Sequence, residues 1–443
     1  MRKYFRKHRL SSFQIIIMGF AAVILCGALL LMLPVCTNEG VVTPFPDALF
    51  TAASAVCVTG LVIRDTALYW SVTGQIVILV LIQIGGLGVV TITAFFALLS
   101  GRKISLFQRS ILQDNFCAPQ IGGIVRLIRF IFWTVFAIEL LGMLVMLPAF
   151  YSAYGSPGIW MSAFHAVSAF CNAGFDLMGS HTGAFSSLTA FSGSLSVSLT
   201  VTFLIVIGGI GFLTWHDIAE QGIRFKKFRL QSKVILVTTV LLIVLPAALF
   251  FVNDFAALPM KTRILTSLFQ AVTPRTAGFN TADLTAMSSS SQVVLIILML
   301  IGGSPGSTAG GLKTTTAAVL IANGFSVFRR KANVQLMGRR VEDSVVKSAA
   351  TLLYLYISLS VFGAMAISMH ENLAFGPCLF ETASAIGTVG LSLGLTPALG
   401  TFSHMILIFL MFFGRVGGLT LIFAAVSAKK TESRCPVEKI TVG

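Results

Sequence analysis

Four short segments of this 443-residue chain share one pattern, in which a mostly apolar run ends at a glycine. A bulky apolar residue stands ten positions before each glycine, and the residue just before the glycine is small or β-branched. The four segments are Phe50–Gly60, Phe164–Gly174, Leu268–Gly278 and Phe380–Gly390. Because the glycines are 114, 104 and 112 residues apart, the chain is a fourfold internal repeat.

The chemistry available to such segments is the coordination of a cation by backbone carbonyl oxygens. A short helix directs its carbonyl end toward positive charge, and the extended residues behind it can replace the water around an ion. Glycine suits the end of that stretch because it adopts backbone conformations closed to other residues. No Asp or Glu occurs in the four extended stretches, so carbonyl selection, which favours K⁺, is expected. The predicted K⁺-binding residues are Val58, Thr59, Gly60, Asn172, Ala173, Gly174, Thr276, Ala277, Gly278, Thr388, Val389 and Gly390.

The composition predicts that a membrane surrounds these segments. Apolar residues make up 56% of the chain and charged residues 11%, against roughly 25% charged in a soluble domain. Several charge-free stretches, such as 66–101 and 177–216, are long enough to cross about 30 Å of hydrocarbon as a helix.

Each quarter of the chain has the same order of elements. A first span is predicted at Phe13–Pro34, Leu127–Pro148, Val234–Val252 and Ser348–Met369, and a second at Gly74–Leu99, Leu195–Trp215, Gln292–Phe325 and Phe402–Ala425. The glycine-ended segment between them is too short to cross and too apolar for a solvent loop, which indicates a re-entrant helix.

The sequence therefore predicts an all-α polytopic membrane protein. Eight transmembrane spans and four re-entrant pore helices would surround one pseudo-fourfold pore. The expected repeats are 1–100, 101–220, 221–332 and 333–443, the last with a cytoplasmic C-terminal tail.

A second repeated feature, a pair of residues that begins with glycine, occurs in each of the four second spans. Gly85-Gly86, Gly208-Gly209, Gly302-Gly303 and Gly414-Arg415 begin 25, 34, 24 and 24 residues after the pore glycines. A single such glycine is best explained by close helix packing, but four in register indicate a second functional layer.

The second span of the third repeat cannot be one continuous helix. Residues 302–311 contain five glycines and a proline, and proline alone costs ~3 kcal/mol in a helix interior. Irregular backbone at membrane depth survives only where protein covers it or where it lines water. We expect an intramembrane gate loop over 302–316, and a kinked helix without function is the alternative. The expected gating residues are Gly302, Gly303, Ser304, Pro305, Gly306, Gly310, Gly311, Lys313 and Arg415.

Several charged residues at membrane depth need partners. Arg415 would cost about 2.5–3.5 kcal/mol at the bilayer centre, and carbonyls of 302–312 are its expected compensation, as a latch and a barrier to K⁺. Alternatively, Arg415 could bond to carbonyls outside this loop. Lys313 could extend to the cytoplasmic side without a role in gating. Arg275 is expected behind the third filter segment, bracing it toward Glu381. Glu139 has no partner that the sequence identifies.

The net charge of +15 follows from topology rather than from nucleic-acid binding. Basic residues cluster at 2–9, 102–129, 224–233, 329–347 and 429–439, each separated from the next by two spans. By the positive-inside rule these clusters are cytoplasmic, as are both termini, in a multi-pass protein of the cell membrane.

Resident cofactors and catalysis are not expected. The seven cysteines are scattered without a C-x-x-C pair, so a metal or redox site is improbable. No metalloprotease, serine-hydrolase or P-loop motif occurs, which argues against an enzyme and means that nucleotide control would require a partner.

These residues resemble the membrane subunit of the bacterial Ktr potassium-uptake system, in the superfamily of Trk, Ktr and plant HKT transporters. The resemblance covers nearly the whole chain and is most specific at Thr273–Asn280, Gly303–Lys313 and Gly387–Leu391. It implies a homodimer with one pore per subunit, on a cytoplasmic ring of nucleotide-binding, RCK-type regulatory subunits. Gly60, where sodium-permeable plant members have serine, implies potassium. Cys57, where relatives have a hydroxyl residue, is a departure.

The expected function is potassium-selective uptake through the carbonyl-lined filter, under control of the gate loop and the regulatory partner. A sodium-coupled potassium symporter that uses the same pore is the alternative. A symporter with paired broken helices is less favoured, because the sequence predicts one break only.

Overall fold

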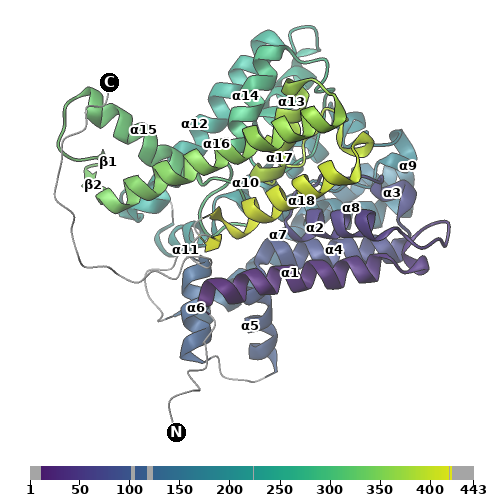
Figure 1. Ribbon diagram of the computed structural model, residues 1–443, viewed down its shortest axis with the longest axis horizontal. Coiled ribbons are helices and arrows are strands. Elements are labelled where there is room, and N and C mark those ends of the chain that lie inside the picture. Colours follow the sequence, from purple (N-terminus) through teal and green to yellow (C-terminus); the bar gives the residue numbers. More distant parts are fainter. Residues whose placement is uncertain (1–10, 101–104, 117–122, 223, 419, 422–443) are drawn as a thin grey trace.

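The computed structural model describes residues 11–100, 105–116, 123–222, 224–418 and 420–421. Long helices run roughly along one direction, which is horizontal in Figure 1. Four of the helices in this part are long and apolar enough to cross a membrane. They are α1 (Ser12–Leu31), α7 (Ile124–Tyr154), α12 (Leu230–Asn253) and α16 (Asp343–Glu371), and they fall on the four predicted first spans.

A short, deeply buried helix precedes each of the four pore glycines. These helices are α2 (Phe45–Val56), α8 (Pro157–Phe170), α13 (Met260–Val272) and α17 (Phe375–Gly387). With 12 to 14 residues they are too short to span a bilayer. Proline lies in the first turn of α2 and α8, where its missing N–H is no loss.

The second apolar segment of every quarter is interrupted, which corrects the prediction of a single break. The helices α4 (Val72–Leu87) and α5 (Val89–Leu99) meet at 96°, as do α10 (Leu195–Gly209) and α11 (Phe212–Gln221). Residues 301–313 separate α14 (Ser289–Leu300) from α15 (Thr314–Phe328), and α18 (Thr401–Val416) ends at Gly417. Gly88, Gly211 and Gly417 have φ of 86°, 92° and 92°, a left-handed backbone that ends a right-handed helix.

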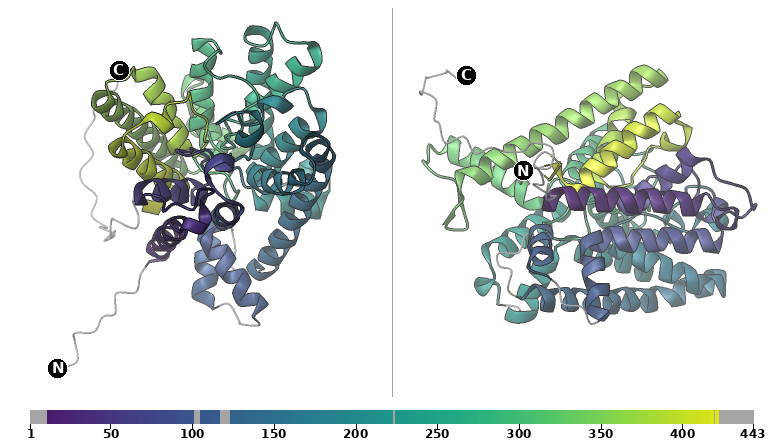
Figure 2. Two further views of the ribbon diagram at one scale, coloured as in Figure 1. Left: turned by 90° about the vertical axis from the view of Figure 1, so that its right-hand side faces the viewer. Right: turned by 60° about the horizontal axis from the view of Figure 1, so that its bottom comes forward.

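The short helices pack in a cycle. The helix α4 contacts α2 of its own quarter and α8 of the next, α10 contacts α8 and α13, α14 contacts α17, and α18 contacts α17 and α2. The last quarter therefore closes onto the first. Viewed along the bundle, the quarters follow one another in sequence order around a common centre (Figure 2, left).

The remaining elements lie mostly at the two ends of the bundle. The helices α3 (Thr66–Tyr69) and α9 (Gly179–Thr182) mark one end, and a hairpin of β1 (Gln335–Leu336) and β2 (Arg339–Arg340) marks the other (Figure 1). The rest are α6 (Leu106–Phe116) and the 3-10 helices η1 (Pro34–Cys36), η2 (Thr189–Phe191), η3 (Phe225–Lys227) and η4 (Thr396–Ala398). Both termini, with the basic clusters 2–9 and 429–439 and the predicted C-terminal tail, lie outside the described residues.

Candidate ion-binding site

Each re-entrant helix ends in a left-handed cap two residues before its glycine. Just after α2, Val58 has a φ of 56° and the Thr59 amide donates to the Ser54 carbonyl at 2.8 Å. This is the bond of a Schellman motif, which satisfies a helix carbonyl with an amide from the segment that follows. The equivalent residues of the other quarters have φ of 59° at Asn172, 69° at Thr276 and 51° at Thr388. The amides of these segments are thus turned back toward their helices, and no hydrogen bond among the described residues uses their carbonyls.

The caps store backbone strain. Val58, Thr276 and Thr388 are β-branched residues with positive φ, a conformation that costs roughly 1–3 kcal/mol and persists only where packing enforces it. The glycine two residues later also has positive φ, between 70° and 92° in the four quarters, while the residue between is not left-handed. Such alternation turns successive peptide groups to the same side of the chain.

The four glycines form a closed ring of backbone contacts. A Cβ added to Gly60 would lie 2.5 Å from the Ala173 carbonyl oxygen, and one added to Gly174 would lie 2.7 Å from that of Ala277. A Cβ on Gly278 would overlap the Val389 carbonyl, and one on Gly390 would overlap the Thr59 carbonyl, which returns to the first quarter. The structure therefore brings all twelve predicted residues together, with no room for a side chain at the four glycine positions.

Buried hydroxyls fasten the extended segments to the helices. The Ser54 hydroxyl accepts from the Gly60 amide at 3.1 Å, and the Ser384 hydroxyl accepts from the Gly390 amide at 3.0 Å. The Ser168 hydroxyl donates to the Phe175 carbonyl at 2.7 Å. These serines were not predicted as site residues, although a serine stands six positions before the glycine in three quarters.

Arg275 and Glu381 do not pair, contrary to the expectation from the sequence. Arg275 is 3% exposed, and its Nη2 donates to the Thr239 hydroxyl at 3.1 Å on α12. The Glu381 carboxylate accepts from the hydroxyls of Ser392 and Thr396, both at 2.6 Å. Arg275 Nη2 and the Glu381 carboxylate thus bond to hydroxyls and not to each other, and Glu381 holds the chain that leaves the fourth glycine.

A cavity of about 510 Å³ borders the glycine ring on the side of α3 and α9. Three of its residues are acidic: Asp65, Asp176 and Asp283. Burial, with a smaller contribution from the Asp65 carboxylate, raises the pKa of Asp176, which lies outside the spanning helices, to about 7. These carboxylates were not predicted as site residues from the sequence, although Asp65 and Asp283 each lie five residues after a pore glycine.

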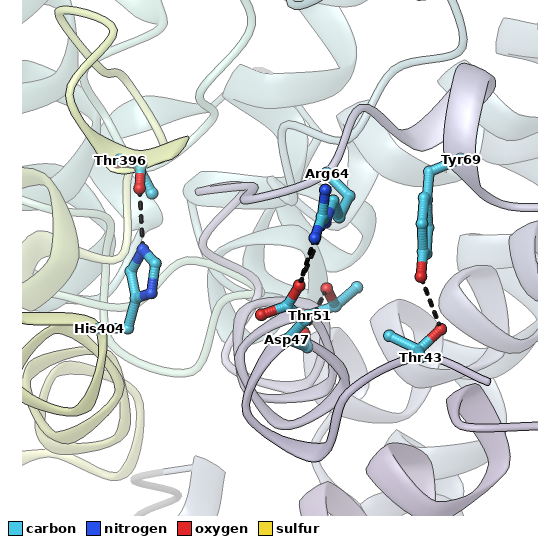
Figure 3. A network of polar contacts seen from close by, with 7 residues as sticks. All are labelled: Thr43, Asp47, Thr51, Arg64, Tyr69, Thr396 and His404. Atoms are coloured by element: carbon cyan, nitrogen blue, oxygen red, sulfur yellow. Dashed lines mark hydrogen bonds and ion pairs between the residues drawn. The ribbon is translucent and has the colours of Figure 1, made fainter. Parts of the chain in front are cut away.

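Polar contacts brace the first quarter near this cavity (Figure 3). The Arg64 guanidinium donates to the Asp47 carboxylate at 3.1 Å, which ties the chain leaving Gly60 to the start of α2. The Tyr69 hydroxyl donates to the Thr43 hydroxyl at 3.1 Å. These contacts fix the outgoing chain against its own re-entrant helix.

The glycine-rich loop 301–313 lies against the other side of the ring. A Cβ on Gly310 would overlap the Thr388 side chain, so the loop reaches the first residue of the fourth filter segment. Its amides donate to carbonyls freed where neighbouring helices break: Ser304 to Gly209 at 2.9 Å, Thr308 to Gly208 at 3.2 Å and Gly311 to Gly414 at 3.3 Å. The Lys313 ammonium donates back to the Ala309 carbonyl at 2.9 Å, within the same loop.

Arg415 joins this loop to the first quarter. Its Nη1 donates to the Thr308 carbonyl, and its Nη2 donates to the carbonyls of Gly85 and Gly86, the latter at 3.1 Å. Both carbonyls lie where α4 ends, and that of Gly85 also accepts from the Gly88 amide at 3.2 Å. No sequence signal identified them as acceptors. Beyond the loop, a second cavity of about 360 Å³ is bordered by Lys313 and Arg415, so the two cavities differ in the sign of their charge.

Glu139, for which the sequence offered no partner, accepts from the Gln83 amide at 3.1 and 3.3 Å. Gln83 lies on α4 and Glu139 on α7, so the contact joins the first two quarters beside Cys171, the residue before the filter residue Asn172.

Comparison with known proteins identifies the family. The family model described as TrkH, cation transport protein, matches residues 3–434. The chain belongs to this family. As a TrkH-family protein with several apolar helices, it is an integral membrane protein of cation transport and not an enzyme.

Full-length relatives of this family member are similar in sequence. It is 40% identical to the potassium/sodium uptake protein NtpJ of Enterococcus hirae, over 100% of this chain and 99% of that protein. It is 37% identical to the Ktr system potassium uptake protein B of Bacillus subtilis, over 97% and 96%. The crystal structure of the potassium transporter TrkH from Vibrio parahaemolyticus has the same fold, with a TM-score of 0.75 at 17% identity, over 96% of this chain and 87% of that one.

Proposed function

We propose that this chain is a potassium-selective pore subunit of the cell membrane. K⁺ enters the acidic cavity and passes the ring of carbonyls contributed by the twelve filter residues. The observation that carries the proposal is the closed ring of four glycines, each preceded by the same left-handed cap. Such a ring offers a dehydrated cation oxygen ligands from all sides without side-chain charge.

The proposed architecture has eight spans in four repeats, 1–100, 101–220, 221–332 and 333–443, around one pseudo-fourfold axis. The cyclic packing of α4, α10, α14 and α18 on successive re-entrant helices supports it. The basic clusters support a cytoplasmic location for the hairpin end of the bundle and for both termini.

The proposed gate is the loop 302–316, with Arg415 as its latch. Gly302, Gly303, Ser304, Pro305, Gly306, Gly310, Gly311 and Lys313 would form the movable backbone. The contacts of Arg415 with both Thr308 and the α4 break support this role, because one side chain holds the loop across the pathway. Its charge beneath the filter would also repel K⁺.

Gly60→Ser tests the filter. The added Cβ meets the Ala173 carbonyl at a backbone φ of 91°, so the ring must shift and discrimination against Na⁺ should weaken. The measurement is ⁸⁶Rb⁺ uptake into proteoliposomes with increasing Na⁺ as competitor. Gly376→Ser is the matched control, since a Cβ there has no atom within 4 Å. Equal selectivity of the two variants would refute the filter assignment.

We also propose a homodimer bound to a cytoplasmic ring of nucleotide-binding, RCK-type subunits. Relatives that carry the name of the Ktr system support a multi-subunit assembly. The exposed basic hairpin 329–340 and the segment 224–233 would be the docking surface. Neutralising Arg339 and Arg340 should reduce co-purification with the regulatory subunit, whereas Lys261→Ala at the opposite end should not. Undiminished binding would remove the two arginines from the interface.

Sodium-coupled potassium symport through the same pore is the second candidate. It is favoured by the name of the 40% identical relative, a potassium/sodium uptake protein, and by the interruption of all four second segments rather than one. An inward Na⁺ gradient should then drive ⁸⁶Rb⁺ accumulation above its own electrochemical equilibrium in proteoliposomes. Accumulation that stops at equilibrium would exclude Na⁺-coupled symport and favour the uncoupled pore.

A further inference from the structure

An apolar groove of about 720 Å³ lies between α12, α14 and α15, away from the ion pathway. Its wall on α15 includes Ala318, Ile321, Ala322 and Phe325. Spacings of three and four residues place these side chains on one face of the helix. Because Ala318 and Ala322 are small, this face is hollow where it passes α12 and α14.

The groove opens at the periphery of the bundle, where α14 and α15 lie in Figure 1. Leu245 on α12, Ile297 on α14 and Phe325 on α15 are 65%, 52% and 59% exposed. In an integral membrane protein, apolar side chains exposed at this depth face hydrocarbon. The groove is therefore shaped to hold an alkyl chain along its length.

One end of the groove is cationic. Arg329 continues the same face of α15, four residues after Phe325, and Lys331 follows; both border the groove and both are exposed. Neither forms an ion pair with the residues that the structure describes. Because this end carries one of the basic clusters, it lies at the cytoplasmic leaflet in the proposed topology.

We propose that this groove is a binding site for an anionic phospholipid of the cytoplasmic leaflet. One acyl chain lies along α15, and the phosphate lies between Arg329 and Lys331. Basic pockets between transmembrane helices at this leaflet attract anionic headgroups, and each nearby basic residue strengthens the attraction. The inference uses the orientation given under the proposed function but not the filter or the gate, so its failure would leave both untouched.

Charge complementarity favours lipid over a second copy of the chain. A twofold contact through this face would bring the same face of the partner to the same depth. Arg329 and Lys331 would then meet equal charges rather than counter-charges. An anionic headgroup neutralises them instead.

Fluorescence quenching by brominated lipids tests the site. Phe325→Trp, and Ile321→Trp as a second position, place a fluorophore in the groove, and Leu141→Trp on α7 places one on an exposed surface elsewhere. Each protein is reconstituted with brominated phosphatidylglycerol or brominated phosphatidylcholine. Its quenching is then compared with that of the unsubstituted chain, which has four tryptophans.

We expect the groove positions to prefer phosphatidylglycerol by about fivefold to thirtyfold, and Leu141→Trp to show no preference. Arg329→Ala with Lys331→Ala should abolish the preference at the groove. Lys226→Ala with Lys227→Ala, which removes the same charge from another exposed segment of this side, should not. Equal quenching by the two lipids at both groove positions overturns the proposal. Absence of quenching by either lipid also overturns it and indicates that protein fills the groove.

Discussion

The glycine ring and the layer directly beneath it are built from the same fourfold repeat but differ in symmetry. In the ring, all four quarters have a left-handed cap, a left-handed glycine and a backbone contact to the next quarter. In the layer beneath, α4 and α10 bend at a glycine, the third quarter forms the loop 301–313, and the fourth replaces a glycine by Arg415. The four quarters thus have the same backbone structure in the ring but differ from one another in the layer beneath it.

The difference follows from what each layer must do. A spherical ion at the axis is best surrounded by equal oxygens, so each departure from symmetry in the ring weakens coordination. A gate must adopt two arrangements, and one movable element suffices if the others hold still. The loop is held by fixed carbonyls at Gly208, Gly209 and Gly414, which are the broken ends of its neighbours.

The largest effect is expected from breaking the ring at its tightest contact. In Gly390→Ala, the new Cβ overlaps the Thr59 carbonyl at a φ of 92°, and we expect ⁸⁶Rb⁺ flux per folded protein to fall about tenfold or more. Gly376→Ala, on the re-entrant helix that precedes Gly390 and in open space, should keep the flux of the unsubstituted protein. Equal flux from the two variants would mean that the ring is not the ion pathway.

The asymmetric layer should respond in the opposite direction. Removal of residues 305–310, or Arg415→Ala, should raise ⁸⁶Rb⁺ flux several-fold, because each removes the same obstruction. For that reason the double variant should exceed neither single variant, which a double-mutant cycle on correctly folded protein measures. A purely structural loop predicts the reverse, with lower flux and less folded protein in every variant.

A smaller effect is expected from the pH of the outer cavity. The pKa of Asp176, raised by burial to about 7, means that the group is protonated below this pH and gains a negative charge above it. Apparent affinity for ⁸⁶Rb⁺ should therefore improve, by about twofold, as external pH rises from 6 to 8. Asp176→Asn should remove this dependence. If Asp176→Asn keeps the pH profile of the unsubstituted protein, a group other than Asp176 causes the pH dependence of uptake.

The same pKa shift affects stability. Because the folded state holds a proton that the unfolded state releases, the free energy of unfolding falls across pH 4 to 7.

The smallest effect is expected at the hydroxyl braces. Ser384→Ala removes the acceptor of the Gly390 amide, which should lower stability by ~1 kcal/mol and change the K⁺/Na⁺ ratio less than any glycine variant does. Thermal unfolding and competition uptake measure the two quantities. Ser290→Ala, at an exposed position, is the control. A selectivity loss as large as that of Gly60→Ser would show that the ring depends on its braces more than on its glycines.

The four glycines of the ring are marked clearly in the sequence, for a physical reason. A left-handed cap followed by a backbone-to-backbone contact restricts residue types in every quarter, so Gly60, Gly174, Gly278 and Gly390 recur in register. The long first spans were equally clear, because a single helix needs about 20 consecutive apolar residues to cross a membrane.

The asymmetric layer was less predictable. Glycine in a membrane helix commonly serves packing, so Gly88 and Gly211 did not reveal the 96° bends. The acceptors of Arg415 at Gly85 and Gly86 and the hydroxyl partners of Arg275 and Glu381 are set by neighbours from other segments of the chain. Such pairs depend on how the quarters meet, which no local pattern encodes.

The contact between α18 and α2 has a consequence for biosynthesis. The ribosome synthesises the quarters in order. The helix α2 therefore lacks its contact with α18 until that last described helix, more than 300 residues later, has emerged. Until then, the free carbonyls of Val58 and Thr59 lack the fourth quarter and would face lipid, which cannot hydrogen-bond to them. We expect the membrane insertion machinery to shield the first three quarters from lipid during this interval. A chain that ends before residue 401 would leave these carbonyls exposed to hydrocarbon.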